Sequence, residues 1–157
     1  MTHARIALLF PGQGAQYPGM GKDFAEKYPT ARHTFEEADD ILKRNLSSII
    51  WEGPEDRLTE TKNSQTGIYV NSIALLRVLK EMFPSLAPYV TAGLSLGEYS
   101  ALTASGKLDF EEGLHLVERR GQYMNEACLE TKGTMAVAMG LEASQVEEAV
   151  RELKMPN

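Results

Sequence analysis

The chain has 157 residues, of which 43% are hydrophobic and 24% are charged, as expected for one globular domain with its own core. The formal net charge of −6 argues against bulk binding to nucleic acid or to an anionic membrane, and no segment approaches transmembrane length. Cys128 is the only cysteine, so no disulfide can form within the chain. We expect Cys128 to be a small core residue and the protein to be cytoplasmic, or organellar after removal of a transit peptide.

The first predicted element is a buried parallel strand over residues 6–10, a continuous apolar run that ends at Pro11-Gly12. The glycine-rich loop that follows, residues 11–16, does not fit a dinucleotide motif, because the third glycine would fall at Tyr17. It does not fit a phosphate-binding loop either, since no Gly-Lys-Ser or Gly-Lys-Thr follows. Two interpretations remain: a loop that points backbone N–H groups at a reacting group, and a plain turn.

The next part of the chain is predicted to be mostly helical. Residues 21–28 and 30–44 form two helices, residues 47–58 are short and irregular, and residues 64–83 form a long helix with an apolar stripe. Gln65 lies in the first turn of the long helix, where capping or surface exposure is the default expectation. Because a strand and another helix follow, the order of elements predicts a parallel α/β core.

The most informative stretch is Gly93-x-Ser95-x-Gly97, which lies between a β-favouring run and a helix-favouring run. This is the context of a nucleophile elbow, in which a very tight turn between strand and helix exposes a serine hydroxyl. The unpaired N–H of Leu96 and the positive end of the helix dipole would then face a developing oxyanion. The alternative is that Ser95 only caps the helix in a tight turn.

A second informative stretch is the helix predicted from Asp109, its N-cap, to Glu130. At 3.6 residues per turn, Arg119 falls on a polar face, whereas Arg120 falls on an apolar face with Leu116, Tyr123, Met124 and Ala127. An arginine on an apolar face needs an anionic partner. That partner is either a carboxylate elsewhere in the fold or the carboxylate of a substrate, and the helix alone does not distinguish the two.

The C-terminal residues are predicted to open a new βα unit. Residues 133–141 alternate as in a strand, Ser144 and Glu147 have the spacing of a capping box, and an apolar helix stripe follows. The predicted strand has no partner within the chain. We therefore expect a core domain over residues 1–130 and the beginning of a second, truncated subdomain over residues 131–157.

Three motifs together resemble malonyl-CoA:acyl-carrier-protein transacylases. They are Leu9-Phe10-Pro11-Gly12-Gln13-Gly14-Ala15-Gln16, Gly93-Leu94-Ser95-Leu96-Gly97-Glu98-Tyr99-Ser100-Ala101-Leu102, and Arg120-Gly121-x-x-Met124-x-x-Ala127. Their order and spacing match along essentially the whole chain. Members of this family are considerably longer, so the chain resembles the N-terminal part of one. The resemblance implies an α/β-hydrolase-like core and a small ferredoxin-like subdomain.

The resemblance also implies roles for individual residues. Ser95 matches the acylated nucleophile, Arg120 matches the arginine that binds the malonyl carboxylate, and the N–H groups of Gln13 and Leu96 match the oxyanion hole. Gln65 and Met124 match positions that line the acyl pocket. The implied reaction is a ping-pong transfer of malonyl from malonyl-CoA to the phosphopantetheine thiol of acyl carrier protein, in fatty-acid biosynthesis. We expect a monomer that uses no metal and no cofactor.

The chain departs from the family pattern in two respects. Leu94 stands before the nucleophile, where many members have histidine, which we expect to change only the polarity of the pocket. The family's catalytic histidine lies beyond Asn157, and His3, His33 and His115 match no such position. Two alternatives to malonyl transfer therefore stay open: a serine esterase or thioesterase with the same elbow, and a non-catalytic fragment that binds a carrier protein.

Overall fold

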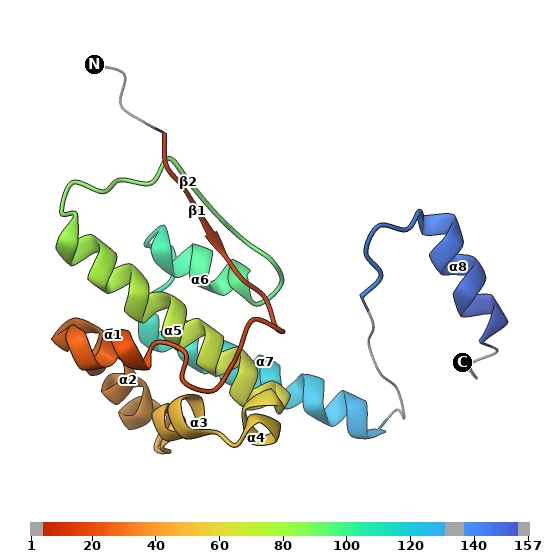
Figure 1. Ribbon diagram of the computed structural model, residues 1–157, viewed down its shortest axis with the longest axis horizontal. Helices are drawn as coiled ribbons and strands as arrows, with labels where there is room; N and C mark the ends of the chain where they lie inside the picture. Colours follow the sequence, from red (N-terminus) through yellow and green to blue (C-terminus); the bar gives the residue numbers. More distant parts are fainter. Residues whose placement is uncertain (1–4, 131–136, 154–157) are drawn as a thin grey trace. The chain divides into compact units, whose positions relative to one another are not determined.

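The computed structural model describes residues 5–130 and 137–153 of the chain (Figure 1). These residues divide into two compact units, Met1–Ala127 and Cys128–Asn157, and each unit is described separately below. The first unit is mixed α/β and mostly helical, with one pair of parallel strands.

The two strands are β1, Ala7–Phe10, and β2, Val90–Gly93, paired in parallel from Ala7 opposite Val90 to Phe10 opposite Gly93. The predicted parallel pairing is therefore confirmed. The prediction that the first strand is buried is wrong: its residues alternate between exposed and half-buried, and Leu9 is 77% exposed. The reason is that β2 is the only strand beside β1 in the described part of the chain, so one edge and one face of β1 are uncovered.

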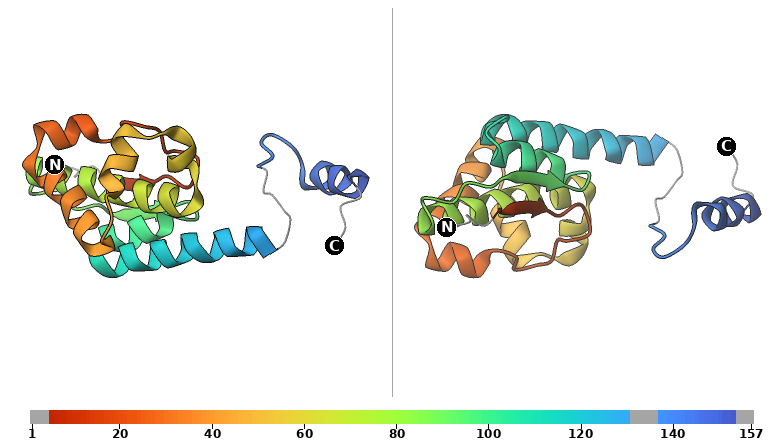
Figure 2. Two further views of the ribbon diagram at one scale, coloured as in Figure 1. Left: turned by 90° about the horizontal axis from the view of Figure 1, so that it is seen from below. Right: turned by 90° about the horizontal axis from the view of Figure 1, so that it is seen from above.

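Four shorter helices follow β1 in the chain before the long helix begins. They are α1 (Lys22–Lys27), α2 (Pro29–Leu42), α3 (Leu46–Glu52) and α4 (Glu55–Thr59). The irregular stretch predicted for residues 47–58 is wrong, because α3 and α4 occupy it on either side of Gly53-Pro54. Two short helices form there because Leu46, Ile50 and Leu58 are fully buried in the core. Figure 2 shows α1 (red), α3 and α4 (yellow) on the opposite side of the long helix from residues 110–127 (cyan).

The long helix α5, Thr61–Met82, contributes more buried core residues than any other element in the described part of the chain. Its predicted stripe is confirmed for Tyr69, Ile73 and Leu76, which are buried. Tyr69 is completely buried: its ring stacks on Phe110, and its hydroxyl donates to the carbonyl of Phe110 at 3.3 Å and pairs with the hydroxyl of Thr103 at 2.8 Å. This tyrosine therefore links α5 to the two helices that follow β2.

Replacing Tyr69 with phenylalanine is expected to cost about 1 kcal/mol of stability, because the paired hydroxyl is lost from a buried site. Burial raises the pKa of Tyr69 to about 12 from 10.0, although the hydrogen bond with Thr103 opposes the shift. The folded state holds this proton to higher pH than the unfolded chain, so its stabilising effect is complete below pH 10 and is lost as pH rises to about 12. Urea unfolding at pH 8 and pH 11 checks this: the difference between wild type and Tyr69→Phe should shrink at pH 11.

The two helices after β2 are α6, Gly97–Ala104, and α7, Phe110–Glu130. The prediction that Asp109 caps α7 is confirmed, because its Oδ1 accepts a hydrogen bond from the backbone N–H of Glu112 at 2.7 Å. Arg119 is exposed on α7, as predicted. No helix in the described part of the chain is long and apolar enough to cross a membrane.

The second unit contains one described helix, α8, Ala143–Glu152. The predicted capping box is wrong in register: Glu142 is the N-cap and Gln145 is its reciprocal partner. Residues 131–136 lie outside the described part, and residues 137–141 are not a strand, so the predicted strand over 133–141 is wrong where it can be compared. Cys128 is exposed, which contradicts the prediction of a core cysteine. The ferredoxin-like subdomain stays a prediction.

Candidate active site

Ser95 lies at a tight turn between β2 and α6, and its backbone has a φ of 53°, in the left-handed region that residues with a Cβ rarely adopt. Its side chain is exposed, as the elbow prediction requires. The strain in this turn is maintained by close packing on both sides. A Cβ on Gly93 would lie 2.0 Å from the carbonyl carbon of Gly97, so only glycine fits at this position, two residues before the serine.

Gly97, two residues after the serine, allows a different close contact. A Cβ on Gly97 would lie 2.3 Å from the carbonyl oxygen of Phe10 and 2.9 Å from that of Pro11. The start of α6 therefore rests directly on the backbone where β1 ends. This contact brings the loop over residues 11–16 beside Ser95, and the backbone N–H of Leu94 donates to the carbonyl of Phe10 at 3.3 Å.

Replacing Gly97 with alanine is expected to cost about 2–3 kcal/mol of stability, because the added methyl group has to displace backbone rather than a flexible side chain. Thermal or urea unfolding measures this loss. Ser105→Ala is the matched control, since Ser105 is exposed at the other end of the same helix and should change stability by less than about 0.5 kcal/mol. Equal stability of the two variants would contradict the packing described here.

Arg120 reaches the serine from α7. One Nη donates to Ser95 Oγ at 2.8 Å and the other donates to Gln65 Oε1 at 2.5 Å. In the described part of the chain, no Asp or Glu oxygen lies within 4.0 Å of this guanidinium. The guanidinium is half-buried and is held by two neutral partners, so the interpretation as an ion pair within the fold does not describe these residues.

Gln65 connects the arginine to the loop after β1. It is fully buried, and its Nε2 lies 3.2 Å from Gln13 Oε1 and 3.1 Å from Met124 Sδ. The default expectation of a cap or surface role for Gln65 is therefore wrong. The structure thus brings together five of the six predicted site residues, Gln13, Gln65, Ser95, Arg120 and Met124, through direct hydrogen bonds, and Leu96 follows Ser95 in the chain.

The two predicted oxyanion donors are unpaired in the described part of the chain. Within residues 5–130 and 137–153, the backbone N–H groups of Gln13 and Leu96 donate no hydrogen bond. Leu96 itself is fully buried, so its N–H is held at the start of α6 beside the exposed Ser95 hydroxyl. This is the position at which a positive helix end stabilises developing negative charge.

The geometry also gives a role to Gly121, which the sequence analysis named only as part of a motif. Gly121 follows Arg120, and a Cβ at this position would lie 2.8 Å from the Cα of Lys62. The absence of a side chain lets α7 approach the start of α5, which is how Arg120 reaches Gln65. The available signal was a glycine in the interior of a predicted helix, which is unfavourable unless close packing requires it.

No general base is found beside the serine in the described part of the chain. His33 and His115 are both exposed, on α2 and α7, and neither forms a hydrogen bond with Ser95 there. Among the described residues, no group of three or more His, Cys, Asp or Glu side chains could hold a metal ion. The site as described therefore contains an exposed serine hydroxyl, an adjacent arginine, and two backbone N–H groups without a partner among the described residues.

Comparison with known proteins gives these residues a context. The sequence model of the acyl transferase domain matches residues 7–156. The malonyl CoA-acyl carrier protein transacylase of Bacillus subtilis strain 168 is 46% identical over 145 residues, which cover 92% of this chain and 45% of the relative. The Escherichia coli K12 protein of the same name is 40% identical over 148 residues, 94% of this chain and 48% of its own.

Solved structures of malonyl transferases have a similar fold. A malonyl-transacylase solved in complex with the holo acyl-carrier protein of a type II PKS has a TM-score of 0.82 and 37% identity, covering 95% of this chain and 48% of its own. The acyl-carrier-protein-S-malonyltransferase of Bartonella henselae has a TM-score of 0.82 and 38% identity, covering 96% and 49%. This chain thus spans about half the length of the relatives it matches. The chain belongs to the acyl transferase domain family and is homologous to the N-terminal part of malonyl-CoA:acyl-carrier-protein transacylases.

Proposed function

We propose that the protein transfers malonyl groups from malonyl-CoA to acyl carrier protein through an ester on Ser95, in fatty-acid biosynthesis. The observation that carries the proposal is the hydrogen bond from Arg120 to Ser95 Oγ at 2.8 Å, made by a guanidinium with no carboxylate partner among the described residues. An acyl group attached to Ser95 that ends in its own carboxylate would supply that partner. A guanidinium binds a carboxylate in a bidentate pair, which adds both energy and orientation.

In the first half of this reaction, Ser95 Oγ attacks the thioester carbonyl carbon of malonyl-CoA. An Oγ–C bond forms, the C–S bond breaks, and CoA leaves as its thiol with the proton that Ser95 gave up. The N–H groups of Gln13 and Leu96 are the proposed donors to the oxyanion, and Arg120 exchanges Ser95 Oγ for the malonyl carboxylate. Gln65 orients Arg120, and Met124 lines the acyl pocket beside it.

In the second half, the phosphopantetheine thiol of acyl carrier protein attacks the ester and regenerates the free serine. Both halves need a general base, which we place in sequence beyond Asn157 on the family resemblance. The proposal includes the finer fold assignment, an α/β-hydrolase-like core over residues 1–130 and a ferredoxin-like subdomain beginning at 131–157. It also includes a monomeric, cytoplasmic enzyme.

The homology supports this proposal, since the relatives are malonyl CoA-acyl carrier protein transacylases by name. The alternative of a serine esterase or thioesterase is disfavoured by the same arginine, because a neutral acyl chain would leave its charge without an anion. The test uses the protein expressed from its complete gene, incubated with malonyl-CoA and holo acyl carrier protein. We expect malonyl-carrier protein as the product and none with the apo carrier protein; release of free malonate without transfer would identify a thioesterase instead.

A further inference from the structure

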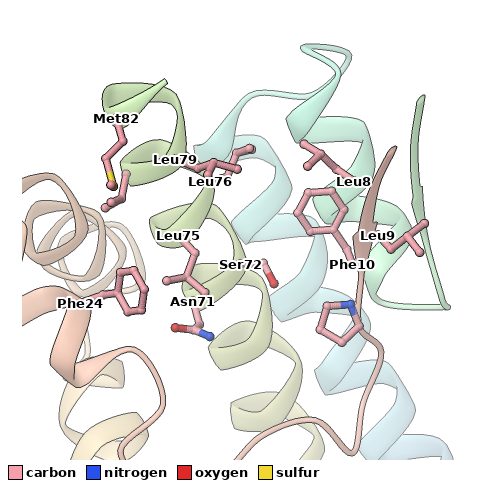
Figure 3. A pocket seen from close by; sticks show the side chains of 12 residues that line it. Leu8, Leu9, Phe10, Phe24, Asn71, Ser72, Leu75, Leu76, Leu79 and Met82 are labelled. Carbon is pink, nitrogen blue, oxygen red and sulfur yellow. The ribbon is translucent and has the colours of Figure 1, made fainter. Parts of the chain in front are cut away.

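The loop over residues 11–16 carries one of the two proposed oxyanion donors, the backbone N–H of Gln13. The base of this loop is well packed. Figure 3 shows Phe10, at the end of β1, on the side of α5, where it contacts the hydrophobic core. A Cβ on Gly12 would lie 2.8 Å from the carbonyl oxygen of Leu94, so the loop also begins in close contact with the turn between β2 and α6.

Past its base, the loop depends on one hydrogen bond. Residues 13–15 are exposed. In the described part of the chain, the only hydrogen bond that joins residues 11–16 to another element runs from Gln65 Nε2 to Gln13 Oε1, at 3.2 Å. An exposed loop with a single external bond takes its position from that bond. The side chain of Gln13 therefore determines where the N–H of the same residue points.

Arg120 sets the direction of this bond. A guanidinium only donates hydrogen bonds, so the amide oxygen of Gln65 has to face Arg120 Nη, 2.5 Å away, and its NH₂ group has to face Gln13. Gln65 is fully buried, so both ends of its amide depend on protein partners. One amide thus joins the arginine beside Ser95 to the loop that carries the oxyanion donor.

We propose that Gln65 is a positioning residue for the oxyanion hole: through the side chain of Gln13, it holds the Gln13 N–H at the carbonyl oxygen of the acyl group. This inference rests on the proposed acyl transfer at Ser95 and adds a second role for Gln65 besides orienting Arg120. The bond between Gln65 and Gln13 acts on every acyl group, because each thioester carbonyl develops the same negative charge in the transition state. The carboxylate of malonyl, by contrast, concerns Arg120 alone.

The test replaces Gln13 with methionine in the protein expressed from its complete gene. Methionine has a similar length and keeps the backbone N–H, but it has no amide oxygen to accept the bond from Gln65. We expect kcat to fall about 10- to 100-fold for malonyl and acetyl transfer alike, with KM changed less than about threefold, because a displaced donor is lost mainly in the transition state. An unchanged kcat, a rise in KM alone, or a loss confined to malonyl would overturn the proposal.

Two further variants show whether the effect passes through Gln65. Adding Gln13→Met to Gln65→Leu should lower the kcat of acetyl transfer by less than about twofold further, because the bond is already absent. Losses that multiply would show that Gln13 and Gln65 act separately and would contradict the proposal. Gln122→Ala is the matched control, since it removes an amide from an exposed position of α7 and should leave kcat within about twofold.

A neutral ester separates this inference from the proposed function. Acylation of Ser95 by p-nitrophenyl acetate needs neither a substrate carboxylate nor a carrier protein, and it releases a burst of p-nitrophenolate. A burst that is about 10- to 100-fold slower in Gln13→Met supports the positioning role even if malonyl transfer to the carrier protein fails. Equal burst rates in wild type and Gln13→Met would overturn it even if malonyl transfer is found.

Discussion

Replacing Arg120 with alanine is expected to reduce malonyl transfer by about 30-fold to several thousandfold, corresponding to about 2–5 kcal/mol for the loss of a desolvated charge pair. Acetyl transfer should change far less, because an acetyl group has no carboxylate for the guanidinium to bind. The ratio of kcat/KM for malonyl-CoA to kcat/KM for acetyl-CoA, measured on the protein expressed from its complete gene, isolates this effect from any general damage to the site.

Two further variants control the Arg120 experiment. Arg119→Ala removes an arginine from the adjacent position of α7, on the exposed polar face, and should leave both activities nearly unchanged. Arg120→Lys keeps the positive charge but loses the planar fork, so it should recover only part of the malonyl activity. An equal loss of malonyl and acetyl transfer in Arg120→Ala would assign Arg120 a structural role through Gln65 and would remove the basis for a carboxylate-bearing substrate.

Replacing Ser95 with glycine is expected to abolish transfer and at the same time to stabilise the fold. The loss of the nucleophile should lower kcat by more than about a thousandfold. The gain arises because Ser95 holds a left-handed φ of 53°, which costs a residue with a Cβ about 1–2 kcal/mol and costs glycine almost nothing. After the entropic penalty of glycine is subtracted, we expect the free energy of unfolding to rise by about 1 kcal/mol.

Urea unfolding of wild type, Ser95→Gly and Ser95→Ala separates the two effects. The alanine variant loses the nucleophile but keeps a Cβ at the strained position, so it should be inactive without the stabilisation that glycine provides. If glycine proves no more stable than alanine at this position, the turn is not strained as the structure describes it. If either variant retains a kcat above about one-thousandth of the wild-type value, Ser95 is not the acylated residue.

The elbow was predictable from the sequence because its determinants are local. The two glycines, the serine and the change from a β-favouring to a helix-favouring run lie within about ten residues, and Gly93 and Gly97 are the positions where a side chain would clash. Periodicity likewise predicted α5 and α7, because their buried faces repeat over several turns. Local signals of this kind do not depend on which other segments cover the element.

Burial was predicted less well, because it depends on distant parts of the chain. The apolar run of β1 indicated a buried strand, yet Leu9 is exposed, since the described residues provide one neighbouring strand instead of two. The helices α3 and α4 were not predicted because they have few turns and therefore little periodicity. Their stability comes from burying Leu46, Ile50 and Leu58 against other elements.

The site shows the same division between local and distant information. The helical period placed Arg120 on a different face from Arg119, but the partner of its guanidinium could not be read from one helix. The partners are Ser95 and Gln65, which lie 25 and 55 residues away in sequence. The default expectation for Gln65 failed because its burial depends on the close approach of α7 that Gly121 allows.

The most direct test of the account is the mass of the protein, expressed from its complete gene, after incubation with malonyl-CoA in the absence of an acceptor. The account predicts a malonyl adduct that peptide mapping locates on Ser95, that Ser95→Gly abolishes, and that holo acyl carrier protein removes. An unmodified mass, or a malonyl group mapped to another residue, would contradict the claim that Ser95 carries the acyl group with its carboxylate on Arg120.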